Sequence, residues 1–191
     1  MNKLKLKELP SDACKLLEKI SQGSQNLDKN VDLLLLKRHL KLVYNVGLEI
    51  VKEISTYWTN LKLLEEEISF GTATHDIGKA IETNELYEIG DNHERVGYNF
   101  LLENGINENF ARFAKTHGNW TLLNLKIEDL IVILADKIWK GKRIDELEER
   151  LTKEIATITN TDYWDVNVKL DAIISKIVIG ADKRLSWQNK F

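Results

Sequence analysis

The chain has 191 residues, 43% hydrophobic and 30% charged, a composition typical of a globular protein with a sizeable core. Its net charge of −3 gives no overall attraction to anionic membranes and disfavours nucleic acid as a partner. The single cysteine, Cys14, excludes an internal disulfide and argues against a thiolate metal site. No segment has the roughly 18 consecutive apolar residues of a membrane span, and residues 1–7 lack the apolar run of a signal peptide. We therefore expect a cytoplasmic protein.

One proline and ten glycines leave few helix breakers, which favours long helices. The first predicted helix has Ser11 as its N-cap and ends in the polar residues 22–26. The second runs from about residue 30 past residue 54, with an apolar stripe at helical spacing that includes His39. The imidazole of His39 therefore points inward, where its ring nitrogens require partners.

A third helix is predicted over residues 61–73. It delivers His75 and Asp76 at its C-terminal end, and Gly78 is expected to end it. Adjacent imidazole and carboxylate groups at a helix end can converge on one cation. A mixture of nitrogen and oxygen ligands suits Mn, Fe or Zn better than Ca or Mg.

The segment over residues 80–91 is predicted as a loop, followed by a helix with His93 in its first turn and Gly105 at its end. Asn107 is expected to cap a short helix that ends at His117. Both histidines therefore lie at helix ends, where histidines also have ordinary structural uses.

A strongly apolar helix is predicted over residues 127–139, with Asp136 inside its buried pattern. Two amphipathic helices follow, over residues 145–157 and from a cap at 161–162 through residue 177. No strand pattern of convincing length and no internal repeat occurs. The sequence therefore predicts an all-α bundle.

Four polar side chains would be costly inside such a bundle: His39, His75, Asp76 and Asp136. An unpaired buried aspartate costs several kcal/mol or becomes protonated. A bound cation would remove that cost for all four. We therefore expect a metal site made of two imidazoles and two carboxylates.

The order of these residues, H…HD…D, resembles the HD-domain metal-dependent phosphohydrolase superfamily. The surrounding residues fit as well, in the stretches 73–79 and 134–138. The resemblance covers roughly residues 31–143 and implies an all-α bundle in which these four residues bind the first metal. We therefore predict one HD-type domain over 1–191, with helical extensions at 1–30 and 144–191.

Members of the superfamily with two metals add histidines between the HD pair and the last aspartate. His93 and His117 are placed similarly, and the resemblance implies that Asp76 would bridge the two ions. The predicted cofactor is a divalent transition metal such as Mn or Fe, with one or two ions per chain.

Phosphoester hydrolysis follows from such a site because a bound cation lowers the pKa of water toward about 7 and polarises a phosphoryl oxygen. Besides the catalytic Asp76, Lys79 resembles the phosphate-contacting lysine of HD-x-x-K members, although a lysine at a helix end is often simply solvated. A second phosphate-binding patch is predicted after the last aspartate, from Lys137, Lys140 and Arg143.

The predicted function is hydrolysis of a phosphoester of a small metabolite, with nucleotides as the first class to test. Residues 92–99 hold only a fragment of the double-histidine and Gly-Tyr-Pro signature of cyclic-dinucleotide phosphodiesterases, which argues against that substrate. Two alternatives remain open: an HD-type di-iron oxygenase, and a non-catalytic metal-containing ligand-binding module. The sequence is also compatible with a homo-oligomer.

Overall fold

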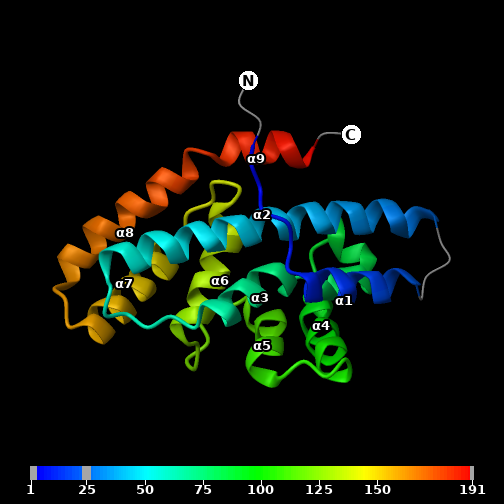
Figure 1. Ribbon diagram of the computed structural model, residues 1–191, viewed down its shortest axis with the longest axis horizontal. Helices are drawn as coiled ribbons and strands as arrows, with labels where there is room; N and C mark the ends of the chain where they lie inside the picture. Colours follow the sequence, from blue (N-terminus) through cyan, green and yellow to red (C-terminus); the bar gives the residue numbers. More distant parts are fainter. Residues whose placement is uncertain (1–3, 23–26, 190–191) are drawn as a thin grey trace.

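The computed structural model describes residues 4–22 and 27–189, with side chains described for 4–22 and 32–189. These residues form α-helices and two short 3-10 helices, and no strand occurs among them (Figure 1). The all-α prediction is confirmed. The elements are α1 (Ser11–Gln22), α2 (Leu27–Tyr57), α3 (Glu65–Thr74), η1 (Ile77–Ala80), η2 (Thr83–Leu86), α4 (Asn92–Glu103), α5 (Glu108–Thr116), α6 (Ile127–Ile138), α7 (Asp145–Thr159), α8 (Tyr163–Val178) and α9 (Ala181–Gln188).

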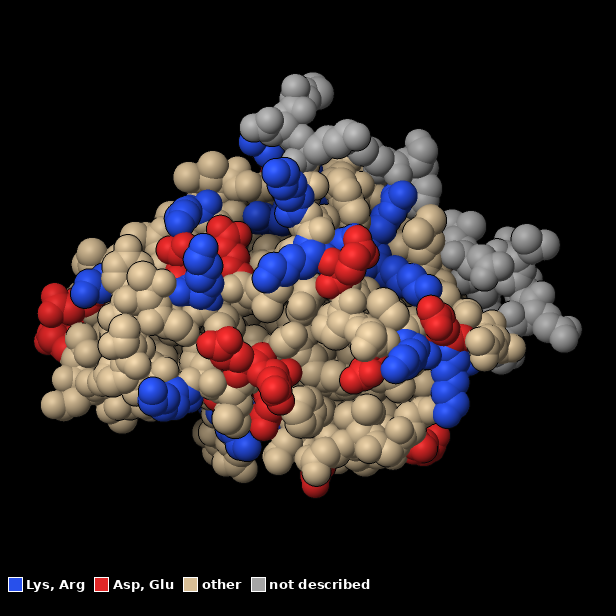
Figure 2. Space-filling view, in the orientation of Figure 1, with Lys and Arg blue, Asp and Glu red and all other residues tan. Residues whose placement is uncertain are grey.

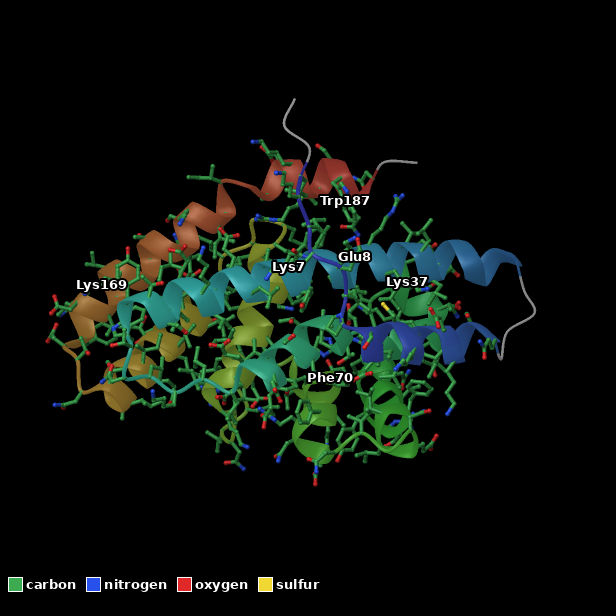
Figure 3. The ribbon with its side chains drawn as sticks, viewed as in Figure 1. Lys7, Glu8, Lys37, Phe70, Lys169 and Trp187 are labelled. Carbon is green, nitrogen blue, oxygen red and sulfur yellow. The ribbon has the colours of Figure 1, made fainter. Side chains whose placement is uncertain are left out.

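The longest helix, α2, crosses the whole molecule and contacts most of the other elements. Figure 1 shows α7 and α8 towards one end of α2, α1 and α4 towards the other, and α5 below its middle. The segment before α1 also lies on α2, where the backbone N–H of Lys7 donates to Asn45 Oδ1 at 2.7 Å and Glu8 pairs with Lys41 (Figure 3). The fold is thus organised along one helix.

Buried apolar side chains form two clusters, and α2 contributes to both. The larger cluster joins the C-terminal half of α2 to α6, α7 and α8, whereas the smaller one joins its N-terminal half to α1, η1, α4 and α5. Leu40 belongs to the smaller cluster and Val43 to the larger. His39 therefore lies close to the point along α2 where one cluster gives way to the other.

Several helix boundaries differ from the sequence prediction. The third helix begins at Glu65 rather than at residue 61, because three consecutive glutamates favour the positive N-terminal end of a helix. Ser11 lies inside α1, and the carbonyl of Pro10 accepts from Cys14 N–H instead. The predicted caps Asn107 and Asp162 are confirmed. Residues 23–26 of the predicted polar loop lie outside the described part of the chain.

The last helix, α9, was not predicted, and its buried residue Arg184 ties it to the bundle. The guanidinium donates to the carbonyls of Ile138 and Trp139 at the end of α6, at 3.3 and 2.6 Å, and to Ile177 near the end of α8 at 2.7 Å. These are carbonyls that a helix leaves without intrahelical partners. Trp187 also faces Arg38 of α2, 5.9 Å from its guanidinium carbon (Figure 3).

The surface carries charges of both signs. Lysine and arginine are interspersed with aspartate and glutamate on the face shown in Figure 2, in keeping with the small net charge. Within the described residues, no helix has the length and apolar character that a membrane crossing requires.

Replacing Arg184 by Ala should lower the free energy of unfolding by about 2–4 kcal/mol, because it removes three charged hydrogen bonds that join α9 to the ends of α6 and α8. Chemical denaturation of the metal-free protein measures this loss. Lys183→Ala is the matched control, since Lys183 is exposed on the same helix and should change stability little. Wild-type stability of Arg184→Ala would contradict this account of α9.

Candidate metal centre

The first group of ligand-type side chains comes from α2, the α3–η1 junction and α6. His39 Nε2 lies 3.1 Å from Asp76 Oδ2, 3.4 Å from Asp136 Oδ1 and 3.2 Å from His75 Nε2. His75 is the C-cap of α3 and Asp136 lies in the last turn of α6. Their ligand atoms all fall within 4.8 Å of one another, close enough to hold one metal ion.

The second group shares Asp76 with the first. His93, in the first turn of α4, and His117, the C-cap of α5, place their Nε2 atoms 3.3 Å apart. Both nitrogens approach Asp76 Oδ1, at 3.2 and 3.0 Å, whereas Asp76 Oδ2 faces His39. Each oxygen of this carboxylate therefore serves a different group. The structure brings together all six residues that the sequence predicts as ligands.

Gly78 allows the HD turn to press against α4. It lies inside η1 rather than ending α3 in a left-handed conformation, so its predicted role as a helix stop is wrong. A Cβ atom at this position would fall 2.0 Å from the carbonyl oxygen of His93. The glycine is therefore required by a close backbone approach, which brings Asp76 near His93.

The hydrogen bonds of the ring Nδ1 atoms indicate how the rings are oriented. His75 Nδ1 donates to the carbonyl of Thr72 at 3.2 Å, and His117 Nδ1 donates to Ala114 at 3.1 Å. A carbonyl can only accept, so Nδ1 carries the hydrogen. In the neutral ring, Nε2 then carries an unshared lone pair.

These lone pairs point at other acceptors. The Nε2 atom of His75 faces that of His39 and carboxylate oxygens, and His117 Nε2 faces Asp76 Oδ1. Asp76 Oδ1 is buried and has no hydrogen-bond partner among the described residues. Converging nitrogen and oxygen acceptors without a donor fit a divalent transition metal, which neutral imidazoles and carboxylates bind.

Both aspartates of the cluster are ionised at neutral pH. Burial acts to raise the pKa of Asp76, but its interactions with the nearby imidazoles, first with His75 and then with His117, outweigh burial and hold the pKa well below its usual value. Burial also acts to raise the pKa of Asp136, but its close contacts with His39 and His75 outweigh burial and lower the pKa well below its usual value. The site therefore offers two negative charges to a cation.

The pKa values of His39 and His75 are shifted in opposite directions. Burial tends to lower the pKa of His39, but hydrogen bonds to Asp136 and Asp76 leave it raised. For His75, which is fully buried, the loss of solvent dominates and the pKa is lowered. Neutral His75 is the form that can donate its lone pair to a metal.

A cavity of about 320 Å³ opens beside the first group, and His39 and Asp76 form part of its wall. Lys79 lies on this cavity with its Nζ 2.8 Å from Asp76 Oδ2, and Lys140 lines it too. The other residues that line the cavity are Leu35, Leu36, Leu86, Trp139 and Gln188.

The remaining predicted phosphate-binding residues have other partners. Lys137 Nζ lies 2.7 Å from Asp136 Oδ2. Arg143 does not line the cavity, because its guanidinium is held by Glu148 and Asp171. The structure thus brings Lys79 and Lys140 to the cavity, and keeps Lys137 on the carboxylate of the first group.

Sequence reasoning missed Glu85, which lies in η2 within the predicted loop. Its Oε2 accepts from His93 Nδ1 at 2.5 Å. Leu86 and Gln188 of the cavity wall were missed as well. No local pattern marks these residues, because each acquires its role from a contact with a different element of the fold.

The model of the HD domain family matches residues 36–139, which is 104 of 191 residues. The chain belongs to the HD domain family. The matched segment contains all six His and Asp residues of the two groups, and the resemblance seen in the sequence is confirmed. Neither a curated protein nor a solved structure matched this HD chain.

Replacing Asp76 by Ala should reduce bound Mn to well below one ion per chain, because Asp76 contributes an oxygen to each group. Elemental analysis after Mn loading and desalting measures the content. Asp182→Ala, which removes an exposed carboxylate of α9, should retain the wild-type content. Full occupancy in Asp76→Ala would rule out the proposed ligand set.

Replacing His117 by Ala should lower the Mn content from close to two ions per chain to close to one, because His117 belongs to the second group only. The remaining ion should still protect the protein against thermal unfolding, since a ligand that binds only the folded state stabilises it. A loss of both ions would show that the two groups form a single site.

Proposed function

We propose that this HD chain is a metal-dependent phosphohydrolase that hydrolyses a phosphoester of a small metabolite, with nucleotides as the first class to test. The HD domain family consists mostly of metal-dependent hydrolases. The observation that carries the proposal is the cavity beside His39 and Asp76, because Lys79 supplies a positive charge there.

The His and Asp residues would hold one or two divalent cations. His39, His75 and Asp136 belong to the first position, His93 and His117 to the second, and Asp76 lies between them. When bound, such cations lower the pKa of water and polarise a phosphoryl oxygen.

Lys79 would stabilise the negative charge that develops on the phosphoryl group. Its Nζ bonds to Asp76 Oδ2 and its side chain is 23% exposed, so it lies between the carboxylate cluster and the cavity. A fixed positive charge at this position stabilises a transition state without costly reorganisation. Lys140 provides a second positive charge on the same cavity.

The apolar wall of the cavity would hold the leaving group. Leu36 and Trp139 are buried, and Leu86 completes this side of the cavity. Apolar and aromatic surface beside a cation-binding site suits a ligand with a phosphate at one end and a flat, weakly polar group at the other. A nucleoside phosphate has this chemistry, which is why nucleotides come first.

The experiment is a screen of nucleoside monophosphates, cyclic nucleotides and simple aryl phosphates with the Mn-loaded protein, measured as release of phosphate or of the aryl alcohol. Hydrolysis that disappears in Asp76→Ala supports the proposal. A metal-loaded protein that hydrolyses none of these compounds overturns it in favour of a binding module. Oxygen consumption by the Fe-loaded protein tests the oxygenase alternative.

Replacing Lys79 by Ala should lower kcat/KM by roughly one to three powers of ten while the metal content stays unchanged, because one stabilising charge is lost. Lys79→Arg should recover only part of the activity, since the guanidinium is wider and differently shaped. Lys142→Ala removes an exposed lysine that does not line the cavity and serves as control. Wild-type kinetics of Lys79→Ala would show that Lys79 is only a solvated helix-end lysine.

A further inference from the structure

We propose that Glu85 is a positioning residue for the second metal position, which it serves by fixing the orientation and the tautomer of His93. The inference concerns metal binding and does not depend on which reaction the protein catalyses. It rests on the contacts of one carboxylate with the first turn of α4.

Glu85 makes three contacts with that turn. Its Oε2 lies 2.5 Å from His93 Nδ1 and 3.0 Å from the backbone nitrogen of His93, and its Oε1 lies 3.1 Å from the backbone nitrogen of Asn92. The side chain of Glu85 is only 10% exposed. The carboxylate therefore holds both the ring and the backbone of the same ligand residue.

The bond to Nδ1 determines which ring nitrogen is available to a metal. An ionised carboxylate can only accept, so Nδ1 of His93 carries the hydrogen and Nε2 is left as a lone pair. Nε2 is the atom that lies 3.2 Å from Asp76 Oδ1 and 3.3 Å from His117 Nε2. Glu85 thus directs the lone pair of His93 into the second group.

His93 needs a stronger partner than the other histidines because of where it lies on its helix. His75 and His117 are C-caps, and the partial negative charge at a helix C-terminus favours a cation. His93 lies in the first turn of α4, where the partial positive charge opposes a cation. The negative charge of Glu85 offsets that end of the helix.

The hydrogen-bond partners of the ring nitrogens also set His93 apart from His75 and His117. Backbone carbonyls accept from Nδ1 of His75 and His117, whereas a carboxylate accepts from Nδ1 of His93. A carboxylate partner makes an imidazole a more basic ligand. Asp76 is the one carboxylate in the second group, and it is shared with the first. The greater basicity of His93 therefore matters most in this group.

Glu85 also replaces the usual cap of α4. Asp91 occupies the N-cap position, but its side chain makes no capping hydrogen bond. Glu85 accepts from the two backbone N–H groups instead, which is a purely structural use of the same carboxylate. The two roles must be separated by experiment.

The variant Glu85→Gln helps to separate them, because its single amide oxygen can still accept from one of the two backbone N–H groups while the negative charge beside His93 is lost. Glu85→Ala removes both, and Asp91→Ala is the matched control at the nominal cap. Mn²⁺ alone is titrated into each metal-free full-length protein by calorimetry, and bound Mn is counted by elemental analysis. Nitrogen-15 NMR of the imidazole rings reports the tautomer of His93.

The wild type should bind two Mn²⁺ ions. In Glu85→Gln and Glu85→Ala the dissociation constant of the weaker site should rise about 10–100-fold, with the tighter site and Asp91→Ala unchanged. The NMR spectrum of Glu85→Ala should lose the pure Nδ1–H tautomer of His93. These results would support the positioning role whether or not any phosphoester is hydrolysed.

Two results would overturn the inference. If Glu85→Gln binds the second Mn²⁺ as tightly as the wild type, while Glu85→Ala unfolds more easily, then Glu85 only caps α4. If the wild type binds a single ion under all loading conditions, His93 is not part of a second metal position. The proposed phosphohydrolase function would survive either result, because the first group would remain intact.

Discussion

The rest of the structure depends on how the mutual repulsion of the buried hydrogen-bond acceptors around Asp76 is compensated. The imidazoles of His75, His117 and His93 turn Nε2 inward because their Nδ1 atoms donate to two backbone carbonyls and one carboxylate. Two ionised carboxylates share the same small volume. Such a cluster is costly in a protein interior unless positive charge is present. Lys79 and Lys137 supply part of that charge, and divalent cations would supply more.

The bundle meets this requirement by directing helix ends at the cluster. The C-terminal ends of α3, α5 and α6 carry His75, His117 and Asp136, and the partial negative charge of these ends adds to the attraction for a cation. Gly78 lets the HD turn approach the backbone of α4 closely enough for Asp76 to reach both groups. Arg184 holds the end of α6 against α8 and α9, which steadies the helix that carries Asp136.

Most of the helices and the inward position of His39 could be predicted, because the sequence patterns that specify them are local. Apolar residues at helical spacing predicted the helices, and the inward position of His39 follows from the stripe on α2. Left-handed Gly105 follows the end of α4, as the sequence indicated, and Gly141 follows the end of α6 in the same conformation. Gly78 was misinterpreted, because a glycine needed for a close approach and a glycine that ends a helix look the same in one dimension.

The sequence by itself determined the helical class and the six candidate ligand residues, because periodicity and the H…HD…H…H…D order are properties of the chain. The tertiary structure alone determined which neighbours these residues have. It assigned Lys79 and Lys140 to the cavity and Arg143 to Glu148, although all three are basic residues close to a ligand in sequence. It also brought Glu85 to His93 and α9 to the end of α6, because such contacts depend on the packing of separate helices and leave no mark in the local sequence.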